Sequence, residues 1–165
     1  MSALKKIILA PVALVALAVS VQAMAQQERK TIQLEATIPS LEFHVEPVDN
    51  SWIGTPQVLG WNPIAGSLDT LRKQFFAKHT AGSIEASLLN TAELQSIVGN
   101  DKIDLEVSFN NKALSTTGVE VLTEAEAEQG STVWLEIKPT TPAGGYVAGN
   151  YEGNVQLAFD AVLAP

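Results

Sequence analysis

Side chains that commonly carry out chemistry are scarce in this sequence. It contains two histidines, His44 and His79, and no cysteine. A chain without cysteine has no thiol nucleophile, no thiolate metal ligand and no disulfide framework. The sequence also lacks the H-E-x-x-H and G-x-S-x-G patterns, which place a catalytic zinc ion and an exposed serine nucleophile. We therefore expect a protein that is not an enzyme and holds no cofactor.

His44 lies in the apolar-rich stretch SLEFHVEP. The letters HVE match a fragment of the zinc-deaminase signature, but the paired cysteines that complete this signature are absent. A lone histidine in such a stretch is most often an ordinary side chain on one face of a strand. We interpret His44 in this way.

Acidic residues lie close enough in sequence to suggest a cation site at two places. Asp101, Asp104 and Glu106 form the first group, in which Asp104 and Glu106 share one face of an expected strand. The second group is the acidic run at 124–128. Runs of like charge are most often solvated surfaces, so we expect no metal site at either place.

Two tryptophans, Trp52 and Trp61, lie in the loop-rich stretch SWIGTPQVLGWNP. Aromatic rings in such a loop can bind sugars, and they can also plug the open end of a β-sandwich. The second interpretation is favoured here, because buried aromatic rings are common in sandwich domains.

Strands would position all of these residues, because apolar and polar side chains alternate along most of the chain after residue 30. The clearest runs are 84–88, 103–109, 133–137 and 155–161. Each would have one buried and one wet face, as in antiparallel sheets. The chain has no βαβ rhythm and carries turn residues at short intervals. This pattern predicts an all-β fold, an immunoglobulin-like antiparallel β-sandwich of about seven to nine short strands.

Turn and cap residues divide these runs. Asn110-Asn111 follows the run 103–109 and tolerates left-handed turn geometry. Residues 139–150, PTTPAGGYVAGN, form a loop rich in proline and glycine. Thr123 with Glu126 resembles a capping box and predicts one short helix. We expect a second helical turn in TAELQSIV, residues 91–98.

The N-terminal segment has the pattern of a secretory signal peptide. Lys5 and Lys6 precede an apolar run at 7–19 that is too short to span a bilayer, and Ala23-Met24-Ala25 fits a cleavage site. We expect residues 1–25 to be removed on export, with cleavage after Ala23 as the second choice. The formal net charge of −8 argues against binding to nucleic acid or to an anionic membrane surface.

Residues 30–39, KTIQLEATIP, have the alternation of an isolated amphipathic strand. Its apolar face would carry Ile32, Leu34, Ala36 and Ile38, and its polar face Thr31, Gln33, Glu35 and Thr37. Pro39 then interrupts the strand, since proline has no amide proton. The segment is either the first strand of its own sandwich or a donor strand that completes the sheet of a neighbouring copy. Alternation alone does not decide between these hypotheses.

Several segments together resemble the alpha-class (class 5) fimbrial pilins, the major subunits of colonisation-factor-antigen and cable pili. The segments are KTIQLEATIP, SLLNTAELQSIV followed by IDLEVSFNNKALSTT, and AGNYEGNVQLAF near the C-terminus. The last of these is the most specific. The resemblance covers essentially all of the chain after the signal, except for a poor match at 45–76, an early proline in the first segment and an extended C-terminus.

The resemblance implies a sandwich that lacks its final strand. In the alternate chaperone–usher pathway, a periplasmic chaperone supplies that strand temporarily. At the outer-membrane usher, the N-terminal extension of the next subunit replaces it. Polymerisation continues into a fimbria on the cell surface that carries a tip adhesin. The partners implied are therefore other copies of this chain, the chaperone, the usher and the adhesin.

The resemblance also implies roles for particular residues. Residues 26–39 would form the N-terminal extension, and 40–165 the sandwich domain. Thr31 to Ile38 would be the donor strand, with Ile32, Leu34, Ala36 and Ile38 as its plugs and Pro39 at the joint. Asn154 to Leu163 would border the acceptor groove, with Val155, Leu157 and Phe159 facing the core.

The function implied is that of a major structural subunit that polymerises by donor-strand exchange and supports adhesion. The alternative is a minor or tip subunit, or a secreted glycan-binding sandwich, for which Trp52 and Trp61 would be the binding residues.

Overall fold

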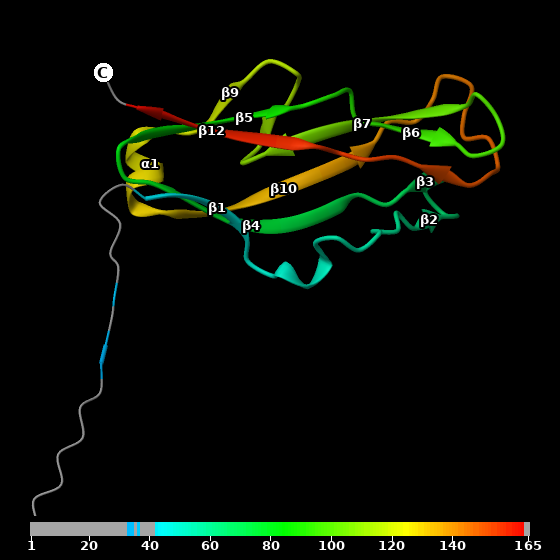
Figure 1. Cartoon of the computed structure of the whole chain (residues 1–165). Coiled ribbons are helices and arrows are strands. Elements are labelled where there is room, and N and C mark those ends of the chain that lie inside the picture. The colour runs from blue at the N-terminus through cyan, green and yellow to red at the C-terminus, as the bar shows by residue number, and fades with distance from the viewer. Residues whose placement is uncertain (1–32, 35, 37–41, 164–165) are drawn as a thin grey trace, which may run out of the picture. The chain divides into compact units, whose positions relative to one another are not determined.

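The computed structural model describes residues 33, 34, 36 and 42–163. The chain divides into two units, Met1–Thr37 and Ile38–Pro165. The expected signal peptide lies outside the described residues. The second unit, which is the body of the molecule, is built almost entirely of antiparallel strands (Figure 1).

Two main sheets and one small hairpin make up the body. The larger sheet has the order β1-β4-β10-β7-β6-β11, with β8 beside β7. Its strands are β1 (Phe43–Pro47), β4 (Leu71–His79), β6 (Glu93–Ser96), β7 (Lys102–Phe109), β8 (Lys112–Ala113), β10 (Ser131–Pro139) and β11 (Tyr151–Glu152). The smaller sheet has the order β12-β5-β9, from β12 (Leu157–Leu163), β5 (Gly82–Leu88) and β9 (Val119–Leu122). The hairpin pairs β2 (Trp61–Asn62) with β3 (Ser67–Leu68).

The alternating runs form the core between the two sheets. Ile84 and Ala86 of β5, Phe109 of β7 and Leu135 of β10 are all buried in one cluster that draws on both sheets. Alternate side chains of a strand point to opposite faces, so one face of each run enters the core while the other stays wet. The expected immunoglobulin-like sandwich is confirmed.

The turn between β7 and β8 follows from its two asparagines. Asn110 and Asn111 have φ angles of 49° and 59°. Both lie in the left-handed region, which asparagine tolerates and which a two-residue hairpin turn requires. The expected turn at this dipeptide is therefore confirmed.

The expected short helix is α1 (Glu124–Gln129). The backbone N–H and the hydroxyl of Thr123 both donate to the carboxylate of Glu126, at 2.9 and 2.8 Å. These two bonds hold the pKa of Glu126 below its ordinary value, because they favour the charged carboxylate. A 3-10 turn, η1 (Asn50–Trp52), is the other described helical segment. Neither helix is long and apolar enough to cross a membrane.

The prediction of a helical turn in residues 91–98 is wrong. Glu93–Ser96 form β6, which pairs with β7 on one side and with β11 on the other. The local sequence suits a helix, but pairing with two neighbouring strands satisfies its backbone groups in an extended form. Tertiary context here outweighs local propensity.

The strand registers define two ends of the body, which we call the near end and the far end. The near end holds Phe43, which begins β1, the paired His79, and Leu163, which ends β12. The far end holds Leu71, which begins β4, and Leu157, which begins β12. Helix α1 lies at the near end, whereas β2, β3 and β6 lie at the far end (Figure 1).

Gly153 allows the chain after β11 to pass close to β6. A Cβ atom at this position would collide with the carbonyl oxygen of Glu93, which belongs to the backbone and cannot rotate away. We expect Gly153→Ala to lower the free energy of unfolding by about 1–3 kcal/mol, as overpacked positions do. Denaturant unfolding of purified fimbriae, followed by tryptophan fluorescence, would measure the loss.

The matched control for this substitution is Gly144→Ala. Gly144 has no atom within contact distance of an added Cβ and lies in the same chain. Equal unfolding midpoints for the two variants would contradict the role assigned to Gly153.

Candidate functional site

The last strand, β12, is an edge of the smaller sheet. Among the described residues it pairs with β5 alone, with Leu157 opposite Leu88 and Phe159 opposite Ala86. Half of the backbone N–H and C=O groups of an edge strand point away from its partner, and they are free to pair with another strand. We call this free side of Leu157–Leu163 the β12 edge.

The core-facing side chains of β12 are incompletely covered. Directly opposed residues of an antiparallel pair point to the same face, so Leu157, Phe159 and Ala161 face the core as their β5 partners do. Those partners, Leu88, Ala86 and Ile84, are buried. In contrast, Leu157 and Phe159 are only half-buried and Ala161 is exposed. Leu163, at the end of the same row, is 66% exposed.

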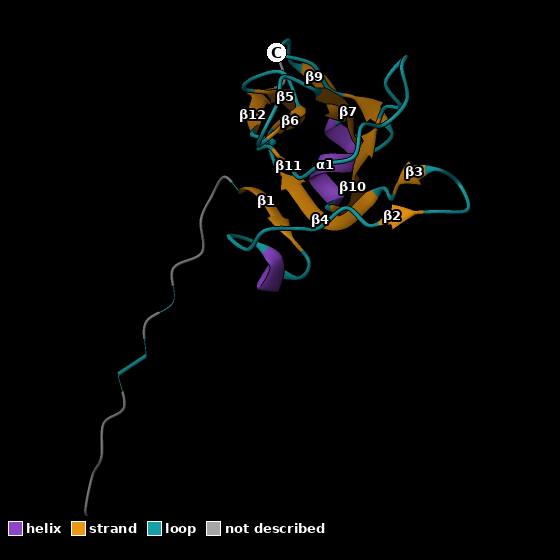
Figure 2. Cartoon of the chain, turned by 90° about the vertical axis from the view of Figure 1, so that its right-hand side faces the viewer, coloured by secondary structure: helices purple, strands orange, loops and turns teal. Residues whose placement is uncertain are grey.

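The edge of the larger sheet on the same side shows a similar deficit. Strand β1 pairs with β4 alone among the described residues, and Phe43, Val45 and Pro47 point to the core face because their partners do. Phe43 is nevertheless 43% exposed. Figure 2 shows β1 and β12 along one side of the body. Both sheets therefore present partly uncovered core-facing side chains on this side.

Phe159 joins the β12 edge to the middle of the core. Its ring lies 4.9 Å from that of Phe109 and 6.3 Å from that of Phe75, centroid to centroid. Val155 comes before β12 rather than inside it, and it too packs partly buried against the core. Val155, Leu157 and Phe159 thus all pack partly buried against the core, and the strand begins at residue 157 rather than at the expected residue 154.

An edge of this kind can accept one more strand. A segment laid along β12 would pair with its free backbone groups, and every second side chain would cover Leu157, Phe159 and Ala161. Such a segment needs an apolar face with period two, which is the pattern of residues 30–39.

Three residues of that segment are described: Gln33, Leu34 and Ala36. They lie outside any helix or strand, and Leu34 is 91% exposed. Thr31, Ile32, Glu35, Thr37, Ile38 and Pro39 lie outside the described residues. A large aliphatic side chain with this exposure gains nothing from the hydrophobic effect, and burial against another surface would stabilise it.

The histidines occupy ordinary structural positions. His44 is a half-buried residue of β1, and its Nε2 lies 3.4 Å from a carboxylate oxygen of Glu46. His79 is buried at the end of β4, where its Nδ1 lies 3.1 Å from the carbonyl oxygen of Ser83. The interpretation of His44 as a strand-face side chain is confirmed.

The acidic groups are surface side chains. Asp101, Asp104 and Glu106 are exposed, and Glu106 lies 3.8 Å from the ammonium group of Lys138 on the neighbouring strand. The residues that the structure describes contain no group of three or more potential ligands that could hold a metal ion.

The two tryptophans of the loop-rich stretch differ. Trp52 packs against the core, with its ring 6.1 Å from that of Phe75, as expected of a plug. Trp61 lies in the β2–β3 hairpin and is 52% exposed, so it plugs the sandwich only in part. Sequence analysis placed His44 on a strand face but did not identify β1 as a second open edge, because alternation does not reveal which strands lie beside a strand.

Comparison with known proteins identifies the family of this chain. The sequence profile of the CS1 type fimbrial major subunits matches residues 28–160. The chain belongs to this family. It is therefore a major structural subunit of a bacterial fimbria, and its copies polymerise into a fibre at the cell surface. The family is structural, and the expectation of an alpha-class fimbrial pilin is confirmed.

A solved structure shares the fold of this fimbrial subunit. It is the structure of the CooA pilin subunit from enterotoxigenic Escherichia coli, with a TM-score of 0.62 and 19% sequence identity. The match covers 72% of this chain and 86% of that one. No curated protein sequence matches the chain.

Proposed function

We propose that this fimbrial subunit polymerises by donor-strand exchange, with residues 31–38 of one copy lying along the β12 edge of the next. The observation that carries the proposal is the incomplete burial of Leu157, Phe159 and Ala161 on the core face of β12. An amphipathic segment of the same chain, with Leu34 exposed, supplies the matching apolar face.

The donor strand would use its apolar face as a set of plugs. Ile32, Leu34, Ala36 and Ile38 would enter the core, and Thr31, Gln33, Glu35 and Thr37 would face solvent. Burial of the three large side chains contributes about 1.5–3 kcal/mol each, before the backbone ladder is added. Pro39 would end the strand, because it has no N–H to donate to a further ladder bond.

In this assembly the chain has three parts, and a chaperone and an usher bring the copies together. Residues 1–25 would be a signal peptide for export to the periplasm, 26–39 the donor extension, and 40–165 the acceptor body. A free copy with an uncovered β12 edge is prone to pairing with any strand. A periplasmic chaperone would cover the edge until an outer-membrane usher passes the copy to the fibre, which ends in a tip adhesin.

The test of this proposal is the strength of the fibre in the absence of covalent links. The chain contains no cysteine, so no disulfide joins the copies. Dissociation must expose a row of apolar plugs together with the open core, and it should therefore be slow. We expect unheated fimbriae in mild detergent to run as a ladder of multimers on gel electrophoresis, and boiled fimbriae to run as single subunits.

A sample that dissociates fully without heating would contradict the proposal. Fibres treated with a thiol reductant serve as the control, and their ladder should be unchanged.

A further inference from the structure

The far end of the body carries an unusual share of exposed apolar side chains. Among the described residues, Ile64 is 97% and Val98 94% exposed. The apolar far-end patch consists of Trp61, Ile64, Leu89, Ile97, Val98 and Val147. These residues come from the β2–β3 hairpin, the chain after β5, the β6–β7 turn and the loop before β11. Two of these residues, Trp61 and Val147, line one cavity, and exposed apolar residues that lie together mark an interaction surface.

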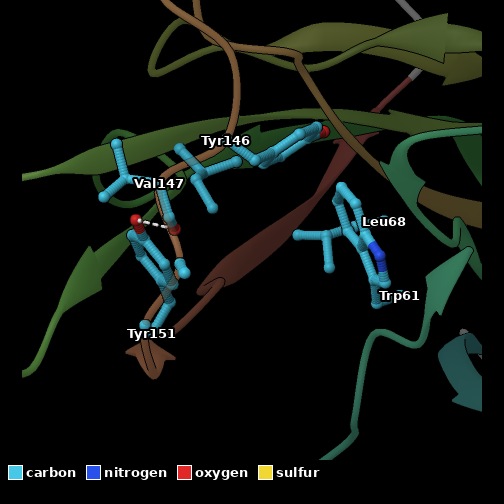
Figure 3. Close-up of a pocket in the computed structure, with 8 residues that line it drawn as sticks. Trp61, Leu68, Tyr146, Val147 and Tyr151 are labelled. Carbon is cyan, nitrogen blue, oxygen red and sulfur yellow. Dashed lines mark hydrogen bonds between the residues drawn. The ribbon is translucent and has the colours of Figure 1, made fainter. Parts of the chain in front are cut away.

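A cavity of about 400 Å³ lies within this patch (Figure 3). Trp61 and Leu68 of the hairpin form one wall, and Val147 and Tyr151 form another. The ring of Trp61 meets that of Tyr146 edge to face, with centroids 5.4 Å apart. The lining contains no charged side chain. Such a cavity suits apolar side chains of a protein partner better than a charged ligand.

The buried hydroxyl of Tyr146 has no hydrogen-bond partner among the described residues. In contrast, the hydroxyl of Tyr151 donates to the carbonyl oxygen of Val147, at 2.9 Å. The two tyrosines of the cavity wall therefore differ in their polar contacts.

The connection between the donor strand and the body is short. Only residues 39–41 separate Ile38 from Glu42, where the described body begins. Four residue steps span at most about 14 Å when fully extended. The near end of a donor copy must therefore lie within about 14 Å of the place where its donor strand leaves the acceptor.

The direction of the donor strand determines whether it leaves the acceptor at the far end or at the near end. Strand β12 runs from the far end to the near end, and all described strand pairs are antiparallel. A donor strand antiparallel to β12 runs the other way and delivers its body to the far end. A parallel donor strand would deliver it to the near end, where the acceptor is already joined to the preceding copy. A linear fibre therefore favours the antiparallel direction.

From these observations we infer that the apolar far-end patch is a second subunit interface, which docks the near end of the next copy in the fibre. The inference rests on the proposed donor-strand exchange, and it adds a contact between the two bodies. Phe43 is the exposed apolar residue of the near end closest in sequence to the connection. The joint between copies would then be stiffened by direct packing rather than left to a bare three-residue connection.

Tryptophan quenching in assembled fimbriae tests this interface. In the single chain Trp61 is more exposed than Trp134, at 52% against 40%, and Trp134 lies on β10, outside the patch. Two variants would each keep one of these residues, in a chain carrying Trp52→Phe. We expect acrylamide to quench Trp61 at least twofold less than Trp134, which reverses the order of the single chain. Quenching of Trp61 equal to or stronger than that of Trp134 would overturn the inference.

If the Trp52→Phe chain fails to assemble, the same comparison can be made with Trp61→Phe and Trp134→Phe fimbriae. The difference in acrylamide quenching between each variant and the unchanged fimbriae gives the quenching of the tryptophan that was replaced. A multimer ladder in detergent is the separate readout of donor-strand exchange. An intact ladder with exposed Trp61 would reject the interface and leave the proposed function standing, whereas a missing ladder would reject the proposed function itself.

A cross-link tests whether the near end of the next copy is what docks on the apolar far-end patch. The chain lacks cysteine, so Thr80→Cys at the near end and Ala148→Cys in the cavity wall can be combined in one chain. A short bismaleimide should join copies into a ladder that survives boiling. The control pairs Thr80→Cys with Glu106→Cys, an exposed position in the middle of β7. No ladder for the first pair, or equal ladders for both pairs, would overturn the assignment to the next copy.

Discussion

Deletion of residues 26–38 is expected to abolish fibre formation while leaving a body that still binds the periplasmic chaperone. The deletion removes the donor strand and all four of its apolar plugs, but it removes no described residue of the body. Each subunit would keep its open β12 edge and would have nothing to offer to the edge of the next. Surface fimbriae would be counted by electron microscopy, and chaperone binding by co-purification from the periplasm.

The matched control is deletion of residues 26–29 alone. This shorter deletion removes the polar leader QQER and leaves the alternating segment intact, so normal fibres are expected. Fibres of normal number and length from the longer deletion would contradict the donor role of the N-terminal extension.

The substitution Leu34→Asp is expected to weaken each junction between copies by at least tenfold. Loss of a buried leucine costs about 1.5–3 kcal/mol, and 1.4 kcal/mol already corresponds to a factor of ten. The new carboxylate would also be buried without a charged partner, which adds a desolvation penalty. The dissociation temperature of the multimer ladder in detergent would measure the change.

The control for this substitution is Gln33→Asp, the preceding residue of the same segment. It introduces the same carboxylate on the opposite face of the strand, which would face solvent. Equal effects of the two substitutions would show that negative charge, rather than loss of a plug, weakens the junction.

Period-two alternation predicted the core residues, because each strand of a two-sheet sandwich turns every second side chain toward the other sheet. The runs at 84–88 and 133–137 place their alternating apolar residues in the core cluster. The run at 103–109 does so from Leu105 onward, while Ile103 is buried but lies outside that cluster. The turn at Asn110-Asn111 and the cap at Thr123 were also predictable, because each depends on the geometry of a few neighbouring residues. Local chemistry was sufficient for these elements.

The run at 155–161 shows what the pattern could not reveal. It alternates as clearly as the others, yet its core-facing residues Leu157, Phe159 and Ala161 remain partly or fully exposed. Alternation states which face a side chain takes, but burial also depends on the strands beside it. Alternation therefore does not reveal that β12 pairs with β5 alone among the described residues.

The wrong helical prediction for residues 91–98 and the unrecognised edge at β1 have a related cause. Glu93–Ser96 form a strand because β7 and β11 pair with them, and β1 is an edge because β4 alone pairs with it among the described residues. The far-end cavity likewise assembles Trp61, Leu68 and Tyr146 from segments distant in sequence. A single sequence contains no direct signal for such non-local contacts.

Disulfide trapping in assembled fimbriae would show whether the N-terminal segment of one copy lies along the β12 edge of the next. Ala161→Cys places a thiol on the β12 edge, and it would be combined in turn with Leu34→Cys, Ala36→Cys and Ile38→Cys in a chain that has no other cysteine. Mild oxidation is expected to convert at least one of these pairs into a boiling-resistant ladder that a reductant dissolves. Fimbriae in which every pair behaves like Ala161→Cys alone would contradict this arrangement.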